Sequence, residues 1–222
     1  HFPVMPRLYM GLRRGSRECI SEILAHTPQI PDGCQWGTFL RNHDELTLEM
    51  VTEEDRHYMW EEYAPESRWR CNLGIRRRLS PLVDNDDAKI RLLNAMLLSL
   101  PSSPVLYYGD EIGMGDDPWL PDRDGVRTPM QWDDSETAGF STALPEDFHL
   151  PLIRTFGHDP EHVNVARQMG DPSSLLVWTR AMLGIRRHHP VFGTGEFTDL
   201  GGPDMAVMSF LRHNEHETVL CL

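Results

Sequence analysis

Apolar residues recur at roughly helical spacing over the first 24 residues of the chain. Leu8, Ile20 and Leu24 follow this spacing, and a Gly-Ser pair at residues 15 and 16 interrupts it. A period near 3.6 residues is that of an amphipathic helix. We therefore predict one or two helices in this segment.

Two short apolar runs predict β-strands. Residues 34–40 follow a turn cluster rich in proline, aspartate and glycine, and residues 105–108 read Val-Leu-Tyr-Tyr. Runs of this length and composition, bounded by turn residues, are typical of buried strands. Polar, titratable residues follow each run directly, which is the first sign of a functional site.

Two helices are predicted between these strands. Thr52 resembles an N-cap because acidic residues fill the turn after it, and the helix should run to about Tyr63. Residues 88–100 carry one apolar stripe that Pro101 ends. Helices alternating with strands whose carboxyl ends are polar indicate an α/β fold with a parallel sheet or barrel.

A long irregular segment follows the second predicted strand. Residues 113–140 are rich in Gly, Pro and Asp and long for a connection, so we expect a functional loop there. Residues 144–170 show no regular pattern, and a helix is predicted from Pro172 to His188.

The sequence pattern changes after residue 190. Glycines there separate short apolar runs, which indicates the start of an all-β module. We expect one domain in residues 1–190 and the beginning of a second, cut short, in residues 191–222.

Charge and cysteine content narrow the class of partner. The chain has 34 acidic and 21 basic residues, a formal net charge of −13, which argues against nucleic acid or an anionic membrane surface as partner. No apolar run reaches the roughly 18 residues of a membrane helix. The 4 cysteines are far apart and form no C-x-x-C pair, which favours free thiols in a reducing cytoplasm.

Two polar clusters at the predicted strand ends are candidate functional groups, and each has a structural alternative. Asn42, His43 and Asp44 can converge on a hydroxyl-rich ligand, or they form a turn closed by an Asx-type hydrogen bond. Asp110 and Glu111 are placed likewise, but a carboxylate there can simply pair with an arginine. The sequence leaves both choices open.

Three further patterns are interpreted as structural. The arginines at residues 76–78 are expected to form a solvated face, and residues 84–87 a turn and helix cap. His158 and His162 have the spacing of helical metal ligands, but Pro160 between them argues against a regular helix. We expect no metal site.

Three strings, taken in order and spacing, resemble the α-amylase superfamily, glycoside hydrolase family thirteen. They are FLRNHDELT at residues 39–47, PVLYYGDEIGM at 104–114 and DRDGVRTPMQW at 122–132. The longer runs at residues 40–52, 72–79 and 113–116 are most similar to the branch that interconverts maltose and trehalose. The resemblance implies the C-terminal part of a (β/α)8 barrel followed by the start of an all-β domain.

The resemblance also implies roles for individual residues. Asp44 matches the family's third catalytic carboxylate, which stabilises the oxocarbenium-like transition state, and His43 matches the adjacent hydroxyl-binding imidazole. Asn42 opens the motif and is expected to orient its loop. Three weaker substrate-binding candidates lie in the loop that approaches the pocket in this family: Arg127, Asp122 and Arg123.

A retaining glycosidase also needs a nucleophilic carboxylate and an acid/base carboxyl roughly 5–5.5 Å apart. In the family these lie on earlier strands, upstream of anything that matches here. We therefore expect the chain to be a C-terminal fragment that shows no turnover of maltose by itself.

The activity expected of the parent enzyme is maltose–trehalose interconversion by intramolecular glucosyl transfer. An α-glucosidase or oligo-1,6-glucosidase type of hydrolase is one alternative, and a non-catalytic sugar-binding or assembly module is another. The expected partner is a small disaccharide, and the parent could form a homo-oligomer. No cofactor is evident in this segment, and a structural calcium would belong to the missing part.

Overall fold

The computed structural model describes all residues, 1–222, and they form two compact units. The first comprises residues 1–40, 93–105 and 182–222, and the second comprises residues 41–92 and 106–181. The division falls inside helices α5 (Asp87–Ser99) and α7 (Leu175–His188). No helix is both long and apolar enough to cross a bilayer.

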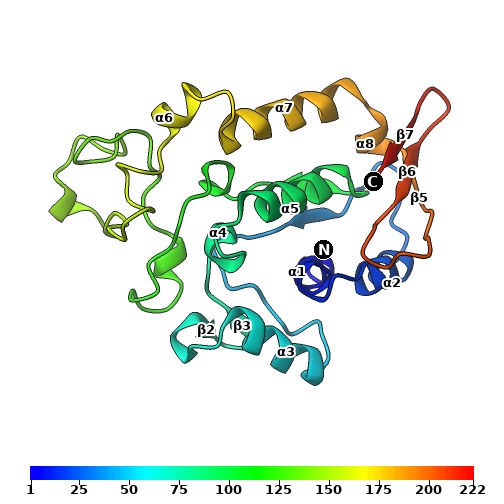
Figure 1. Cartoon of the computed structure of the whole chain (residues 1–222), viewed down its shortest axis with the longest axis horizontal. Coiled ribbons are helices and arrows are strands. Elements are labelled where there is room, and N and C mark those ends of the chain that lie inside the picture. Colours follow the sequence, from blue (N-terminus) through cyan, green and yellow to red (C-terminus); the bar gives the residue numbers. More distant parts are fainter. The chain divides into compact units, whose positions relative to one another are not determined.

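The first unit begins with two helices, α1 (Val4–Arg14) and α2 (Glu18–Ala25), which lie side by side (Figure 1). Gly15 ends α1 in the left-handed conformation, with φ at 59°, and its backbone N–H bonds back into the last turn. Glycine adopts this conformation without steric cost, so the break predicted near residues 15 and 16 is confirmed.

The first unit also holds the parallel strand pair. Strands β1 (Gly37–Phe39) and β4 (Ser103–Val105) run parallel, with Gly37 opposite Ser103 and Phe39 opposite Val105. The parallel arrangement expected of an α/β fold is thus present. The strand predicted at residues 105–108 is displaced, because β4 ends opposite the last residue of β1. It is also less buried than predicted, since Val105 is exposed at the edge of a two-stranded sheet.

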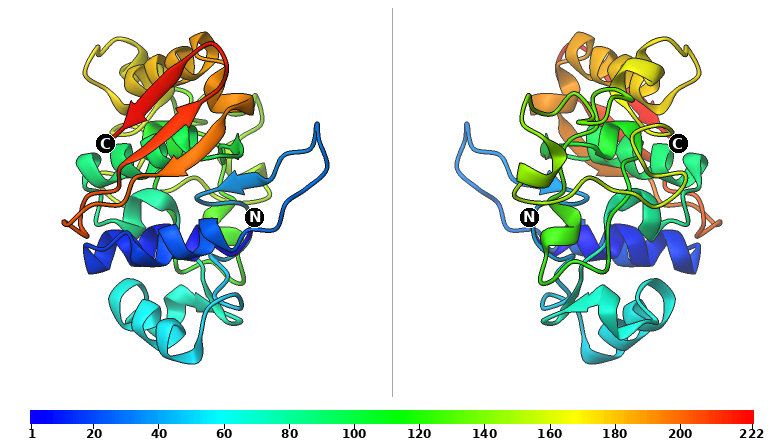
Figure 2. Two further views of the ribbon diagram at one scale, coloured as in Figure 1. Left: turned by 90° about the vertical axis from the view of Figure 1, so that its right-hand side faces the viewer. Right: turned by 90° about the vertical axis from the view of Figure 1, so that its left-hand side faces the viewer.

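Strands that follow the short helix α8 (Val191–Thr194) form an antiparallel sheet in the order β5 (Glu196–Asp199), β6 (Phe210–His213) and β7 (Thr218–Cys221) (Figure 2). The buried Arg212 side chain donates from Nη2 to the carbonyls of Val191 and Gly195, at 3.1 and 2.9 Å. Its Nη1 donates to the carbonyl of Ser99 at 2.7 Å. This arginine therefore ties the sheet to α8 and to the end of α5.

The second unit contains helix α3 (Glu53–Tyr63) beside the hairpin β2 (Arg70–Cys71) and β3 (Gly74–Ile75) (Figure 1). Thr52 caps α3, because its Oγ1 accepts a hydrogen bond from the Asp55 N–H at 3.1 Å. The predicted helix and its cap are confirmed. The remaining elements of this unit are short: 3-10 helices η1 (Ser67–Trp69), η2 (Asp110–Ile112), η3 (Asp124–Val126) and η4 (Pro145–Asp147), and helices α4 (Leu79–Leu82) and α6 (Val165–Met169).

The long segment after Gly113 is irregular, as predicted, yet it has a core of its own. Ile112, Met114, Met130 and Ile153 are buried together, and side chains from the neighbourhood of α6 and α7 pack against them. The predicted helices at residues 88–100 and 172–188 appear as α5 and α7. The expected domains 1–190 and 191–222 differ in their bounds from the two units and stay a prediction.

Candidate active site

The first part of the site is the turn that follows β1. The Asp44 N–H donates to Asn42 Oδ1 at 3.0 Å, so the Asx-type hydrogen bond considered from the sequence is present. Arg41 is buried beneath the turn, donating from Nη2 to the Asp44 carbonyl at 2.8 Å and from Nε to the Arg77 carbonyl at 2.6 Å. The turn is therefore fixed through its own backbone.

The second part is the loop around η3, which brings two arginines to Asp44. Arg123 Nε donates to Asp44 Oδ1 at 2.9 Å, and Arg127 Nη2 donates to the same oxygen at 3.3 Å. Arg127 Nε also donates to the His43 carbonyl at 2.8 Å. Segments about 80 residues apart in the chain thus meet at one carboxylate.

The other Asp44 oxygen, Oδ2, lies 3.4 Å from His43 Nε2, and the carboxylate is 40% exposed. One oxygen of the carboxylate is therefore held by guanidinium groups, and the side chain as a whole is partly exposed. Such an arrangement leaves lone pairs available to hydroxyl groups of a ligand.

Asp122 and Glu45 complete the charge cluster around Arg123. Arg123 Nη1 lies 2.7 Å from Asp122 Oδ1, and Arg123 Nε lies 3.0 Å from Glu45 Oε2. The hydrogen bond between Arg123 and Asp122 raises the pKa of the guanidinium and lowers that of the carboxyl. Asn72, at the turn of the β2–β3 hairpin, donates to Glu45 Oε1 at 2.9 Å.

All six residues predicted for the site thus lie in one cluster. The sequence prediction assigned no role to Glu45 and Arg41, although both belong to the polar run that follows the first predicted strand. The only signal in the sequence for either residue is its place within the run at residues 39–47.

The arginines at residues 76–78 are not a solvated face, and that interpretation is wrong. Arg76 Nη1 donates to the carbonyls of Leu120 and Asp122 at 2.7 and 2.6 Å, which holds the start of the η3 loop. Arg77 Nε contacts the Asp116 carboxylate at 2.9 Å. Arg78 is fully buried, lies over the rings of Tyr107 and Tyr108, and donates to the Tyr108 carbonyl at 2.7 Å. Each arginine has specific partners inside the unit, which overrides the solvation expected of a charge run.

Asp110 is the second carboxylate that the sequence singled out. It is buried, and its Oδ1 lies 3.8 Å from Arg78 Nη1. Burial raises the pKa of Asp110 to about 7, although the charges of Arg78 and Arg41 oppose that rise. The geometry favours the alternative in which this carboxylate pairs with an arginine rather than reaching a ligand.

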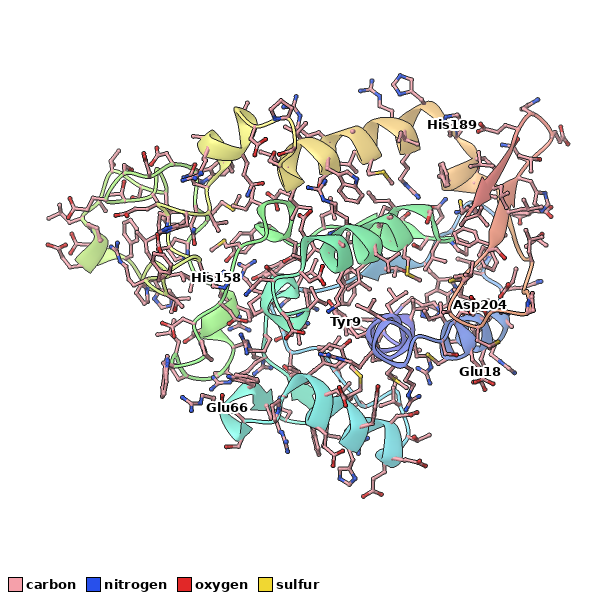
Figure 3. The ribbon with its side chains drawn as sticks, viewed as in Figure 1. Tyr9, Glu18, Glu66, His158, His189 and Asp204 are labelled. Atoms are coloured by element: carbon pink, nitrogen blue, oxygen red, sulfur yellow. The ribbon has the colours of Figure 1, made fainter.

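His158 and His162 have separate surroundings. The His162 ring lies 2.8 Å from Asp159 Oδ1. The His158 ring, labelled in Figure 3, lies in the second unit. It packs against Gly115, where a Cβ atom would stand 2.5 Å from it, and burial lowers the pKa of His158. No group of His, Cys, Asp and Glu side chains is arranged to hold a metal ion.

A cavity of about 450 Å³ adjoins the arginine cluster. Arg127 belongs to both, because it lines the cavity and bonds to Asp44. Most other lining side chains are aromatic or apolar, and Glu111 and His149 are the other acidic or basic ones. The cavity is lined by Tyr108, Glu111, Arg127, Thr128, Pro129, Met130, Trp132, Phe140, Phe148, His149 and Leu150.

Taken together, these features define an α/β protein whose candidate site begins, in the chain, a few residues after a parallel strand. The family model described as "Alpha amylase, catalytic domain" matches residues 58–195, more than half of the chain. The chain belongs to this family. The match includes the η3 loop, whereas Asp44 lies outside it.

Similarity to particular proteins extends over the whole chain. It is 59% identical over 226 residues to a trehalose synthase from Pimelobacter sp. (strain R48), covering 100% of this chain and 39% of that protein. It is 57% identical over 225 residues to the "Trehalose synthase/amylase TreS" of Mycobacterium tuberculosis (strain CDC 1551 / Oshkosh), covering 100% of this chain and 37% of that protein. The chain therefore spans about two fifths of the length of these relatives.

The fold agrees with these matches. The crystal structure of an α-amylase from H. orenii superposes with a TM-score of 0.70 at 20% identity, over 99% of this chain and 37% of that one. The prediction of an α/β fold corresponding to part of an α-amylase barrel is confirmed.

Proposed function

We propose that the chain supplies part of the active site of a retaining enzyme that interconverts maltose and trehalose. The observation that carries the proposal is the partly exposed Asp44 carboxylate, whose Oδ1 is held by two arginines. The similarity to trehalose synthases over the whole chain supports the choice of reaction.

In this proposal Asp44 accepts hydrogen bonds from hydroxyl groups of the reacting sugar and stabilises the positive charge that develops on its ring. Hydrogen bonds that strengthen as the ring flattens supply several kcal/mol of transition-state binding. His43, whose Nε2 lies 3.4 Å from Asp44 Oδ2, binds a second sugar hydroxyl. Arg127 and Arg123 hold the carboxylate in place, Asp122 orients Arg123, and Asn42 orients the turn.

The covalent steps fall to two carboxyl groups that match no position in this chain. The bond between the two glucose units of maltose breaks as one carboxylate attacks the anomeric carbon and the acid/base protonates the departing oxygen. The freed glucose turns, and its anomeric hydroxyl attacks the glucosyl intermediate while returning its proton to the acid/base. Water must stay out during this interval, because it would yield two glucose molecules instead.

Hydrolysis is the second candidate activity. The printed name of the M. tuberculosis relative pairs trehalose synthase with amylase, so both outcomes are named for one protein. The two reactions share every step up to the fate of the glucosyl intermediate. The ratio of trehalose to glucose therefore distinguishes them.

Two further features belong to the proposal. We place the end of the catalytic domain near residues 190–195, supported by the family match ending at 195 and by the antiparallel sheet starting at Glu196.

We place the enzyme in the cytoplasm, supported by four cysteines that are all free thiols.

The test is product analysis on maltose with the full-length protein and with this chain alone. We expect trehalose as the main product of the full-length protein and no turnover by the chain. Glucose as the main product would replace the isomerase by the hydrolase, and trehalose made by the chain alone would contradict the assignment of the covalent steps.

A further inference from the structure

A buried carboxylate, that of Asp116, holds the peptide group that joins Arg77 to Arg78. Asp116 Oδ2 accepts a hydrogen bond from the Arg78 N–H at 2.6 Å, and Arg77 Nε donates to Oδ1 and Oδ2 at 3.0 and 2.9 Å. The Asp116 side chain is only 2% exposed. Hydrogen bonds to a buried charge are stronger than those between neutral groups, so this peptide group is held firmly through its N–H.

The same peptide group is held through its carbonyl by Arg41. This carbonyl, which belongs to Arg77, accepts from Arg41 Nε at 2.6 Å, and Arg41 Nη2 donates to the Asp44 carbonyl at 2.8 Å. Because the peptide bond is planar and trans, its N–H and C=O point in opposite directions and can only turn together. The orientation that Asp116 fixes through the N–H is therefore the one that presents the carbonyl to Arg41.

A continuous series of hydrogen bonds thus connects the Asp116 carboxylate to the backbone of Asp44. It passes through one peptide group and one guanidinium, and the side chains of Asp116 and Arg41 that form it are buried. In such a site no bulk water replaces a lost partner, so a polar group left without one costs free energy. The structure avoids this cost only while every member of the series keeps its orientation.

The segment that carries Asp116 is fixed independently of this series. On one side, a Cβ atom at Gly115 would stand 2.5 Å from the neighbouring imidazole ring, so the backbone lies directly against that ring. On the other side, the Asp117 N–H donates to the Gly125 carbonyl at 3.1 Å. Gly125 belongs to η3, in the loop whose two arginines contact the Asp44 carboxylate. Asp116 is therefore fixed to the same loop that holds the Asp44 side chain.

We propose that Asp116 is a positioning residue for the reaction assigned to Asp44. It fixes the peptide between Arg77 and Arg78, Arg41 transmits that orientation, and the Asp44 turn is held where its carboxylate meets the sugar. The inference rests on the proposed function and adds a buried residue that acts through others rather than on the sugar. A displacement of about 1 Å at a catalytic group can lower a rate by about 10²-fold, so the loss of this support should be measurable in the rate.

A double-mutant cycle in the full-length protein, with maltose as substrate, tests the proposal. Asp116→Asn nearly keeps the shape of the side chain, but it removes the charge and replaces one acceptor oxygen by a donor. We expect it to lower kcat about tenfold and to change KM less than twofold, because Asp44 acts mainly in the transition state. In the Asp44→Asn background the same substitution should lower kcat no further, since Asp116 acts only through that carboxylate.

Two control variants separate positioning from a loss of stability. Thr52→Ala removes the cap of α3 and destabilises the protein at a point outside the series, and Asp134→Asn removes an exposed carboxylate. Both should keep the wild-type kcat. Hydrogen exchange at the Asp44 amide, which donates to Asn42 Oδ1, should accelerate in Asp116→Asn and in neither control.

Wild-type kcat in Asp116→Asn would overturn the positioning role, and so would an equal fractional loss in the wild-type and Asp44→Asn backgrounds. Hydrogen exchange distinguishes this failure from that of the proposed function. A full-length protein that forms no trehalose from maltose would overturn the function. Faster exchange at the Asp44 amide in Asp116→Asn would then still show that Asp116 holds the turn, and unchanged exchange would show that it does not.

Discussion

Buried charged side chains hold loop backbone in place in the second unit. Arg41 and Arg78 are buried and donate to the backbone carbonyls of Asp44 and Tyr108, respectively. A buried guanidinium is costly to desolvate unless its hydrogens are bonded, and replacing one partner of such a network typically costs several kcal/mol. These arginines therefore make the Asp44 turn depend on the packing of the unit as a whole.

Asp110 makes the free energy of unfolding depend on pH. Its pKa is 3.8 in the unfolded chain and about 7 in the folded unit, mainly because of burial. Between these values the folded state binds more protons than the unfolded state, so the free energy of unfolding falls as the pH rises. This fall in the free energy of unfolding is complete above about pH 7, and it never exceeds about 1.4 kcal/mol per pH unit.

We predict that Asp110→Asn abolishes this fall in stability between about pH 4 and 7. Urea unfolding of the chain at several pH values measures it, with Asp134→Asn as the control because that carboxylate is exposed. Parallel stability curves for the wild type and Asp110→Asn would show that Asp110 is not the titrating group.

At this scale the sequence singled out residues that lie together in the folded unit, but it did not identify the side chains that support them. The Asn-His-Asp motif and the loop residues Asp122, Arg123 and Arg127 were identified, since their types and spacing carry the family resemblance. The arginines at residues 76–78 were misinterpreted, because a charge run reveals nothing of which carbonyls surround it in the folded unit. Those partners come from segments 30 to 46 residues away.

Elements with a strong local signal formed where the sequence predicted them. Helix α3 begins after a threonine cap, and α1 ends at a glycine in the left-handed conformation. Strand β4 lies at Ser103–Val105 rather than at the predicted residues 105–108, because its bounds are set by pairing with β1. β1 is short, so pairing stops at Val105 and the two tyrosines continue into the turn before η2.

The cap of α3 can be tested by itself. We predict that Thr52→Ala lowers the free energy of unfolding by about 1 kcal/mol, because the Asp55 N–H loses its acceptor, whereas Thr52→Ser retains most of the stability. Denaturant unfolding measures the difference. Hydrogen exchange at the Asp55 amide should accelerate in the alanine variant alone, and equal rates in all three proteins would argue against the cap.

At the scale of the whole molecule, the alternation of helices and strands was sufficient to predict the α/β class. The grouping of residues into two units was not predictable, because each unit combines segments far apart in the sequence. The chain spans about two fifths of its trehalose synthase relatives, so the proposed site needs groups beyond those described here.

The most direct test of the central claim is a chimera in which this chain replaces the matching segment of the Pimelobacter relative. The claim is that Asp44 serves the chemistry of the family's active site. We predict that the chimera forms trehalose from maltose, that Asp44→Asn lowers the rate by about 10³-fold, equivalent to roughly 4 kcal/mol, and that Asp134→Asn leaves it unchanged. A folded chimera in which Asp44→Asn retains the full rate would contradict the account.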